Sequence, residues 1–349
     1  MRYSKLFLIL FTAIVVFAAY NSYVFSGEEV ASIDDSQYPS KPNWKKGVAY
    51  VQGHGGHIAV IDLVTGEIGR FTHGKPSDAI TISEDGKTLY TFSLDGWSTE
   101  IDVETGKKTE WKRLGKKHCG SAITPDGKHI WVSDMTDGHV YVYDRKTQKK
   151  VDSFPVSKSI CMITFTKDGS KAYVADMPGG FISIVDVKTK KVVGKITNAG
   201  VYIHRGRTTP DGKQIWVSDG AELNKGEPYG QGYTFWEPGE PGGVTVIDAK
   251  TNKVEYKMKI GGNPHGVTFS PDGKYALIPT RQYPYREEAA IVVVNTGHHQ
   301  IVNSISMCDV CHSKIGYKVP HNQDGGRPFN CGMEVDWNRK GLPKGVQKF

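Results

Sequence analysis

Apolar and polar residues alternate along most of the chain in short runs that turn-forming residues separate. Ile130 and Val132 occupy every second position of one run, and Val140 and Val142 do so in the next. A period of two is the pattern of a β-strand with one buried face, because successive side chains of a strand point to opposite sides of the sheet. Asp-Gly pairs between the runs predict tight turns, since glycine adopts positive φ without steric cost. The pattern predicts many short antiparallel strands.

The same pattern recurs along the chain. The copies read EDGKTLYTFSLDGWSTEIDVETGK, PDGKHIWVSDMTDGHVYVYDRKTQK, KDGSKAYVADMPGGFISIVDVKTKK, PDGKQIWVSDG with the later GGVTVIDAKTNK, and PDGKYALIPTRQYPYREEAAIVVVNTGHH. Their turn aspartates are Asp85, Asp126, Asp168, Asp211 and Asp272, which are 41, 42, 43 and 61 residues apart. A sixth copy, KKGVAYVQGHGGHIAVIDLVTGE, precedes them. Repeats of about 40 residues with four strands each predict the blades of an all-β propeller.

The two ends of the repeat array predict how the ring closes. The first copy lacks an innermost strand, because residues 38–44 contain two prolines and no alternation. Near the carboxyl end, GMEVDWNRKG aligns with GVTFSPDGK of the last copy. We therefore expect the C-terminal strand to complete the first blade. Direct counting gives six blades, and a seventh would require more strand than residues 307–327 suggest.

The PDGK turns and the recurring VSD, VID and TGK sequences resemble those of known propellers. They resemble the repeats of the YVTN family and, more distantly, the d-type haem propeller of periplasmic nitrite reductase. The resemblance covers residues 45–305 and implies the propeller fold. It implies little about activity, because propellers serve as enzymes, binders and scaffolds alike.

The first residues have the features of an export signal. Arg2 and Lys5 precede an apolar run over residues 6–19, which is short for a bilayer span, and polar and small residues follow. We expect cleavage near residue 26, with an uncleaved anchor as the alternative. The predicted organisation is a signal peptide (1–26), an N-terminal extension (27–44) and one propeller domain (45–349) with insertions at 220–243 and 306–330. The predicted compartment is extracytoplasmic, either the periplasm or an equivalent compartment.

The charge of the chain is mildly basic. The formal net charge is +7, and it falls to +5 without Arg2 and Lys5. The lysines are too scattered for a nucleic-acid footprint. One cluster is suited to an acidic partner: Lys107, Lys108, Lys112, Arg113, Lys116 and Lys117.

The segment MCDVCHSK contains the spacing that attaches a c-type haem. The thiols of Cys308 and Cys311 would bond the vinyl groups and His312 would take the iron, with His321 or Met333 as the distal ligand. The alternative is a disulfide from Cys331 to Cys308 or Cys311, which an oxidising compartment favours. Residues 307–330 hold little apolar surface, so a haem here would need the propeller face or another subunit as a second wall.

Aligning the repeats predicts a second site in the central channel. Seven residues before the turn aspartates stand Asp78, Cys119, Cys161, His204 and His265. Thiolates and imidazoles suit zinc or copper, so Cys119, Cys161, His204 and His265 form a candidate metal set. The alternative is that the cysteines are buried apolar filler. His118, His54 and His57 are secondary candidates.

Residues 220–243 interrupt the fifth blade with an unusually long loop. Its aromatic residues, Tyr229, Tyr233, Phe235 and Trp236, are candidates for partner contact, because exposed aromatics rimmed by charge are typical of interfaces. Its glutamates offer calcium ligands as an alternative. The alternative to partner contact is that the loop folds over its own blade.

Several catalytic signals are absent from the sequence. It has no nucleophile elbow, Walker loop or dinucleotide fingerprint. Asp134, Asp176 and Asp219 recur at the end of each second strand, and this repetition favours a structural hydrogen-bonding role over catalysis.

The chain also resembles the propeller subunits of hydrazine synthases from anaerobic ammonium oxidisers in its length, export signal and ring. That resemblance implies an extracytoplasmic compartment such as the anammoxosome and an assembly that makes hydrazine from nitric oxide and ammonium. It places the productive haems on other subunits, and no catalytic residue is transferable here. We therefore expect an exported, non-catalytic propeller subunit of a multihaem redox complex, with no nucleic-acid partner. A channel enzyme that handles a haem or metal and a plain binding module are the alternatives.

Overall fold

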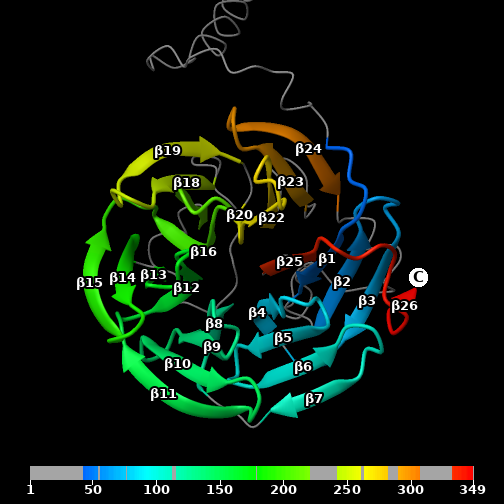
Figure 1. The fold of residues 1–349 in the computed structure, drawn as a ribbon, viewed down its shortest axis with the longest axis horizontal. Helices are drawn as coiled ribbons and strands as arrows, with labels where there is room; N and C mark the ends of the chain where they lie inside the picture. The colour runs from blue at the N-terminus through cyan, green and yellow to red at the C-terminus, as the bar shows by residue number, and fades with distance from the viewer. Residues whose placement is uncertain are drawn as a thin grey trace, which may run out of the picture. The chain divides into compact units, whose positions relative to one another are not determined.

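The computed structural model describes residues 42–53, 56–75, 77–111, 115–177, 179–220, 242–260, 263–281, 290–306 and 332–348. These residues form six antiparallel sheets around a central channel (Figure 1). No helix occurs among them, and therefore none with the length and hydrophobicity needed to cross a bilayer. The predicted all-β propeller with six four-stranded blades is confirmed.

Each blade is numbered in chain order, and its strands are given from the channel outward. Blade 1 contains β25 (Gly332–Asp336), β1 (Val48–Gln52), β2 (His57–Asp62), β3 (Ile68–Thr72) and β26 (Gln347–Lys348). Blade 2 contains β4 (Ser77–Ile82), β5 (Thr88–Ser93), β6 (Ser98–Asp102) and β7 (Lys108–Trp111). Blade 3 contains β8 (His118–Ile123), β9 (His129–Asp134), β10 (His139–Asp144) and β11 (Lys149–Pro155).

Blades 4 to 6 repeat this order. Blade 4 contains β12 (Ile160–Phe165), β13 (Lys171–Asp176), β14 (Phe181–Asp186) and β15 (Lys191–Ile196). Blade 5 contains β16 (Tyr202–Thr208), β17 (Gln214–Gly220), β18 (Gly243–Asp248) and β19 (Val254–Lys259). In blade 6 the innermost strand is split into β20 (Asn263–Pro264) and β21 (Thr268–Phe269), and both pieces pair with β22 (Tyr275–Arg281), which β23 (Ala290–Asn295) and β24 (Gln300–Ser306) follow.

Ring closure follows the predicted scheme. Strand β25 pairs with β1 in antiparallel register from Val48 opposite Asp336 to Gln52 opposite Gly332. The sequence did not predict β26, which pairs with the outer strand β3, Gln347 lying opposite Arg70. The end of the described chain therefore supplies both the innermost and the outermost strand of blade 1.

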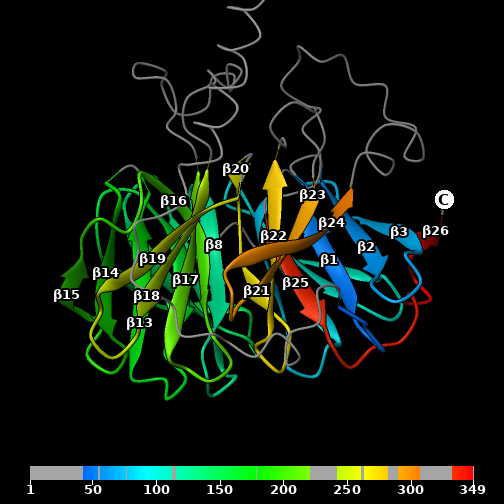
Figure 2. The ribbon, with the colours of Figure 1, turned by 90° about the horizontal axis from the view of Figure 1, so that it is seen from above.

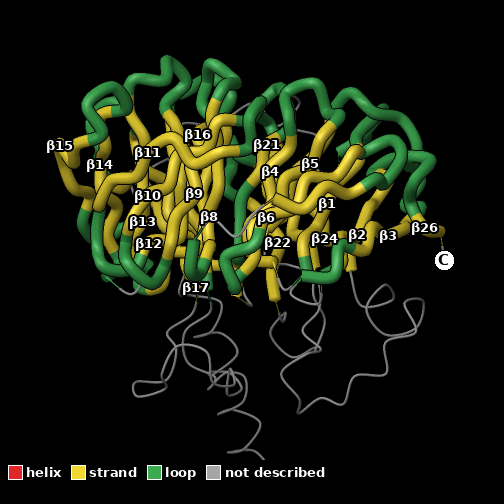
Figure 3. The backbone as a smooth tube through the Cα atoms, turned by 90° about the horizontal axis from the view of Figure 1, so that it is seen from below, coloured by secondary structure: helices red, strands yellow, loops and turns green. Residues whose placement is uncertain are grey.

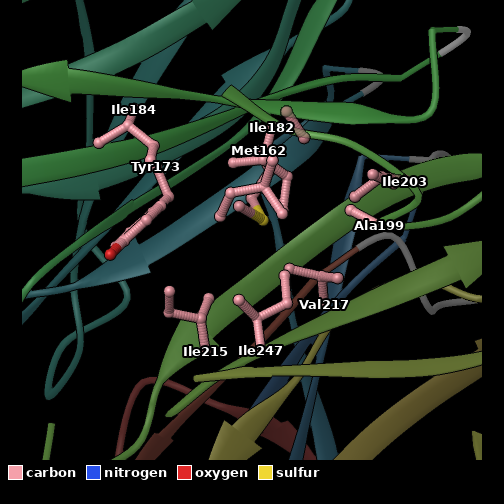
Figure 4. Packing of buried hydrophobic residues seen from close by; sticks show 11 residues of the cluster. Met162, Tyr173, Ile182, Ile184, Ala199, Ile203, Ile215, Val217 and Ile247 are labelled. Atoms are coloured by element: carbon pink, nitrogen blue, oxygen red, sulfur yellow. The ribbon is translucent and has the colours of Figure 1, made fainter. Parts of the chain in front are cut away.

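Apolar side chains fill every interface between neighbouring blades. Alternate residues of one strand face opposite neighbours: Ala49 and Val51 pack toward blade 6, whereas Val48 and Tyr50 pack toward blade 2. Figure 4 shows the interface between blades 4 and 5, where Met162 and Tyr173 meet Val217 and other residues of the next blade. Both faces of the second strand of a blade are thus buried, as in β1, β9 and β13.

The Asp-Gly turns adopt the predicted conformation. In the first of them Gly86 has a φ of 69°, and the Asp85 carboxylate accepts bonds from the Ser83 hydroxyl and the Lys87 amide. These turns form one edge of the ring, and Figure 3 shows the strands running between that edge and the opposite one.

Met333 gives a test of the closing strand. It is 6% exposed within the cluster between blades 1 and 6. We expect Met333→Ala to lower the free energy of unfolding by about 2–5 kcal/mol, because it leaves a cavity in that core. Val64→Ala, at a side chain that is 48% exposed, should change it by less than about 0.5 kcal/mol. Urea titration measures both, and equal effects would contradict the buried position of β25.

Candidate functional site

One edge of the ring, which we call the insertion rim, carries the ends of the strands that flank the long connections. The innermost strands begin there, since Tyr202 pairs with Gly220 and Gln52 pairs with Gly332. The described strand ends that flank segments 221–241, 282–289 and 307–331 lie at this rim (Figure 2). The motif CDVCH, His321 and the aromatic residues Tyr229, Tyr233, Phe235 and Trp236 lie outside the described residues, as do residues 1–41 and His54.

The three repeated aspartates have the structural role expected of them. The Asp134 carboxylate accepts bonds from the backbone amides of Lys116 and Lys117, at 2.7 and 3.0 Å. Asp219 accepts bonds in the same way from the amides that open β16, and burial raises the pKa of its carboxyl. Asp176 bonds the Ser157 hydroxyl ahead of β12. Each aspartate ties the start of the innermost strand to the end of the second strand of its own blade.

The two channel cysteines are joined in a disulfide between the innermost strands of blades 3 and 4. Cys119 and Cys161 are fully buried, and their Cα atoms are 4.8 Å apart. Gly120 makes this approach possible, because a Cβ there would lie 1.6 Å from the Cys161 carbonyl oxygen. In this oxidised form the cysteines offer no thiolate to a metal.

Arg205 crosses the channel beside the disulfide. Its guanidinium donates to the backbone carbonyls of Asp78, Cys119 and, at 3.4 Å, His265. It also lies 3.3 Å from the Asp78 carboxylate, whose second contact is the Cys119 sulfur at 3.2 Å. One side chain from blade 5 thereby connects the innermost strands of blades 2, 3 and 6.

The histidines of the predicted metal set form a separate pair. The rings of His204 and His265 stack with centroids 3.7 Å apart and planes inclined by 27°. Their exposures are 3% and 1%. The four predicted residues therefore fall into two groups: the cysteines adjoin Asp78, and the imidazoles adjoin each other.

Sequence reasoning missed the methionines around the disulfide. Met135 and Met177 pack with both cysteines and with Tyr202 in one buried cluster. The repeat alignment could have identified them, since each methionine follows a repeated aspartate in VSDM and VADM.

Extending the repeat alignment to GMEVD also places Cys331 in the position of His265, although Cys331 lies outside the described residues.

The described secondary candidates, His118 and His57, have the environments of structural residues, and so does His73, which was not among the candidates. His118 is fully buried, with its ring edge-on to Phe92, and burial lowers its pKa to about 4. His73 is also buried, and its pKa is lowered to about 3 for the same reason. His57 lies at the start of β2, where its Nδ1 is 3.0 Å from the Thr72 hydroxyl.

A cavity of about 670 Å³ occupies the channel on the side of the Asp-Gly turns. Arg205 lines it, as do Arg207 and Glu334, which form an ion pair. Met333 also belongs to its wall, but this side chain packs into the core between blades 1 and 6. A distal haem ligand at Met333 would have to leave that core, so the packing favours His321 of the two predicted distal ligands.

Comparisons with known proteins agree on the fold. The PQQ_2 family model, described as outer membrane protein assembly factor BamB, matches residues 26–153. No curated protein matches the sequence of this chain. Hydrazine synthase from Kuenenia stuttgartiensis is 22% identical with a TM-score of 0.53, covering 77% of this chain and 79% of that chain. A functionally unknown protein from Desulfotomaculum acetoxidans DSM 771 is 12% identical with a TM-score of 0.54, covering 75% and 80%. At sequence identities of 22% and 12%, the likeness between this chain and these two structures shows a shared propeller fold.

Replacing Arg205 tests its role as the connector of the channel. We expect Arg205→Met to destabilise the protein by about 3–5 kcal/mol, because it leaves the buried Asp78 carboxylate without its countercharge. Lys213→Met is the control, since it breaks an ion pair whose lysine is 81% exposed and should cost less than about 1 kcal/mol. Chemical unfolding monitored by fluorescence measures both, and a cost for Arg205→Met as small as the control would refute the role.

Because the pKa values of its buried histidines are lowered, we expect the folded protein to lose stability in weak acid. The pKa of His118 is about 4 in the folded protein, against 6.5 in an unfolded chain. The unfolded chain therefore takes up the proton first, so this stability is complete above pH 6.5 and is lost as the pH falls toward 4. We expect a slope of about 1.4 kcal/mol per pH unit for each such histidine.

His118→Phe removes one of these protons and should make the slope shallower. Unfolding free energies measured at several pH values between 4 and 7 give the slope. An unchanged slope in His118→Phe would contradict the depressed pKa. Carboxylates with lowered pKa values, such as Asp168 at about 2, lose their contribution progressively below about pH 5, so the slope between pH 5 and 7 reports the histidines.

Proposed function

We propose that the protein is an exported, non-catalytic propeller subunit of a multi-subunit redox complex, and that the insertion rim is its docking face. The observation that carries this proposal is the position of the long connections. The described strand ends that flank segments 221–241, 282–289 and 307–331 all lie at one rim, and the sequence of these segments contains the CDVCH motif and the aromatic residues Tyr229, Tyr233, Phe235 and Trp236. A rigid ring with inserted segments on one face is suited to holding partners, because the scaffold positions loops without taking part in chemistry.

The haem part of the proposal rests on the CDVCH motif. Cys308 and Cys311 would attach one c-type haem with His312 as the axial ligand, and His321 as the distal one. The disulfide between Cys119 and Cys161 supports this assignment, because it occupies the two other cysteines that could have bridged to the motif. Of five cysteines, only Cys331 then remains to compete for them.

The likeness to known proteins supports an extracytoplasmic complex. The family model that matches residues 26–153 is described as outer membrane protein assembly factor BamB. The structural likeness to hydrazine synthase suggests the finer proposal that the complex makes hydrazine from nitric oxide and ammonium. Under that proposal the reaction takes place on haems of the partner subunits, and this chain supplies a docking surface.

The geometry gives less support to an enzyme in the channel. A d-type haem or metal held by His204 and His265 would require imidazoles that face a ligand. These rings instead stack on each other, and Arg205 crosses the channel next to them. A plain binding module remains the second candidate, and the identity of the co-purifying proteins separates it from a redox subunit.

Covalent haem is measured by a pyridine haemochrome spectrum and by haem staining of the denatured chain. We expect one haem per chain when the full chain is exported by a host that matures c-type cytochromes. Cys308→Ser and Cys311→Ser should each abolish or strongly reduce attachment, whereas Met333→Leu should leave the spectrum unchanged because Met333 lies in the core.

Partner binding is tested separately. Affinity purification from the native source should recover multihaem proteins with the chain. Deleting residues 221–241 should reduce that recovery, and the matched control is Val151→Ser, an exposed site on the outer strand β11. Recovery of the chain alone, without haem, would overturn the redox-subunit proposal and leave the binding module.

A further inference from the structure

Asp78, Cys119 and Cys161 form a compact cluster at the start of three consecutive innermost strands. Their carboxylate oxygen and two sulfurs all lie within 4.8 Å of one another. The sulfurs are fully buried and Asp78 is 7% exposed. Strands β4, β8 and β12 each contribute one of these residues, so the cluster spans blades 2, 3 and 4.

The distances suit a single tetrahedral ion once the sulfurs are reduced. Zinc binds thiolates at about 2.3 Å and carboxylates at about 2.0–2.2 Å, which places neighbouring ligand atoms a little under about 4 Å apart. The Cys119 sulfur already lies 3.2 Å from the Asp78 carboxylate, whereas the two sulfurs are bonded to each other and must separate. Breaking the S–S bond and rotating the two cysteine side chains would allow them to converge with Asp78.

We propose that the reduced cluster is a binding site for a divalent thiophilic ion of the zinc class, so that disulfide and metal are alternative states of one centre. A dithiol reductant supplies two electrons and two protons, becomes a disulfide itself, and converts Cys119 and Cys161 to thiols. Metal binding then releases the two thiol protons. This inference does not depend on the proposed function.

The charges of the cluster favour a divalent over a monovalent ion. Two thiolates and the Asp78 carboxylate carry three negative charges, and the Arg205 guanidinium 3.3 Å from Asp78 supplies one positive charge. A divalent ion makes the buried site neutral, whereas a monovalent ion leaves a net negative charge that burial disfavours. Met135, Met177 and Tyr202 pack around the sulfurs and form an apolar wall.

The test uses the full chain with Cys308, Cys311 and Cys331 changed to serine, so that only the channel cysteines remain. Anaerobic reduction with a phosphine should release two thiols, counted after denaturation. Titration with Co²⁺ should then give thiolate-to-cobalt charge-transfer bands that saturate at one ion per chain and disappear when zinc displaces cobalt. The oxidised chain should show no bands.

Two variants assign the ligands. Cys119→Ser with Cys161→Ser should abolish the bands, and Asp78→Asn should weaken binding by at least about tenfold. The matched control is Glu334→Gln, because Glu334 is also a buried carboxylate paired with an arginine but belongs to blade 1. It should bind as tightly as the parent.

Three outcomes would overturn the proposal: no bands when two thiols have been counted, bands that persist in the double serine variant, or Asp78→Asn binding as tightly as Glu334→Gln. If a variant does not fold, X-ray absorption on the zinc-loaded parent decides the question. Two sulfur scatterers with a light-atom ligand support the site, and a zinc environment without sulfur refutes it.

Discussion

Burial of both faces of the inner strands is the constraint on which this molecule depends. In β1, Val48 and Tyr50 pack against one neighbouring blade while Ala49 and Val51 pack against the other. A blade on its own would expose apolar surface on two sides, so stability requires a neighbour on each side. A closed ring meets that requirement for every blade, and β25 supplies the last missing strand.

The same ring closure determines which residues meet in the central channel. Innermost strands that start at one rim bring their first residues together, which is why Asp78, Cys119 and Cys161 meet although about forty residues separate each from the next. Arg205 binds the strands of Asp78 and Cys119 across the channel. It also lines the cavity on the side of the turns.

Repetition explains why so much of the fold was predictable. Each Asp-Gly turn joins the innermost strand of its blade to the second strand, and the alternation fixes which strand positions are buried. The alignment of GMEVD with the last copy predicted β25 for the same reason. Strand β26 was not predicted, because two residues are too few to show a period.

The candidate site was predictable only in part. The repeat register identified the ring positions, including Cys119, Cys161, His204 and His265, but register carries no information on distances across the channel. Those depend on how closely neighbouring strands approach, which Gly120 decides for the two cysteines. The pairing of cysteine with cysteine and histidine with histidine therefore emerged only in three dimensions.

Blade 1 takes strands from both ends of the described chain, and this has a consequence for the order of events during biosynthesis. β1 is synthesised before the other described strands, yet its neighbour β25 is translated after five further blades. Until then the opening segment has an exposed hydrogen-bonding edge that invites pairing with other chains. A nascent polypeptide of this kind needs shielding throughout its synthesis, because it acquires its protected form only in the final step.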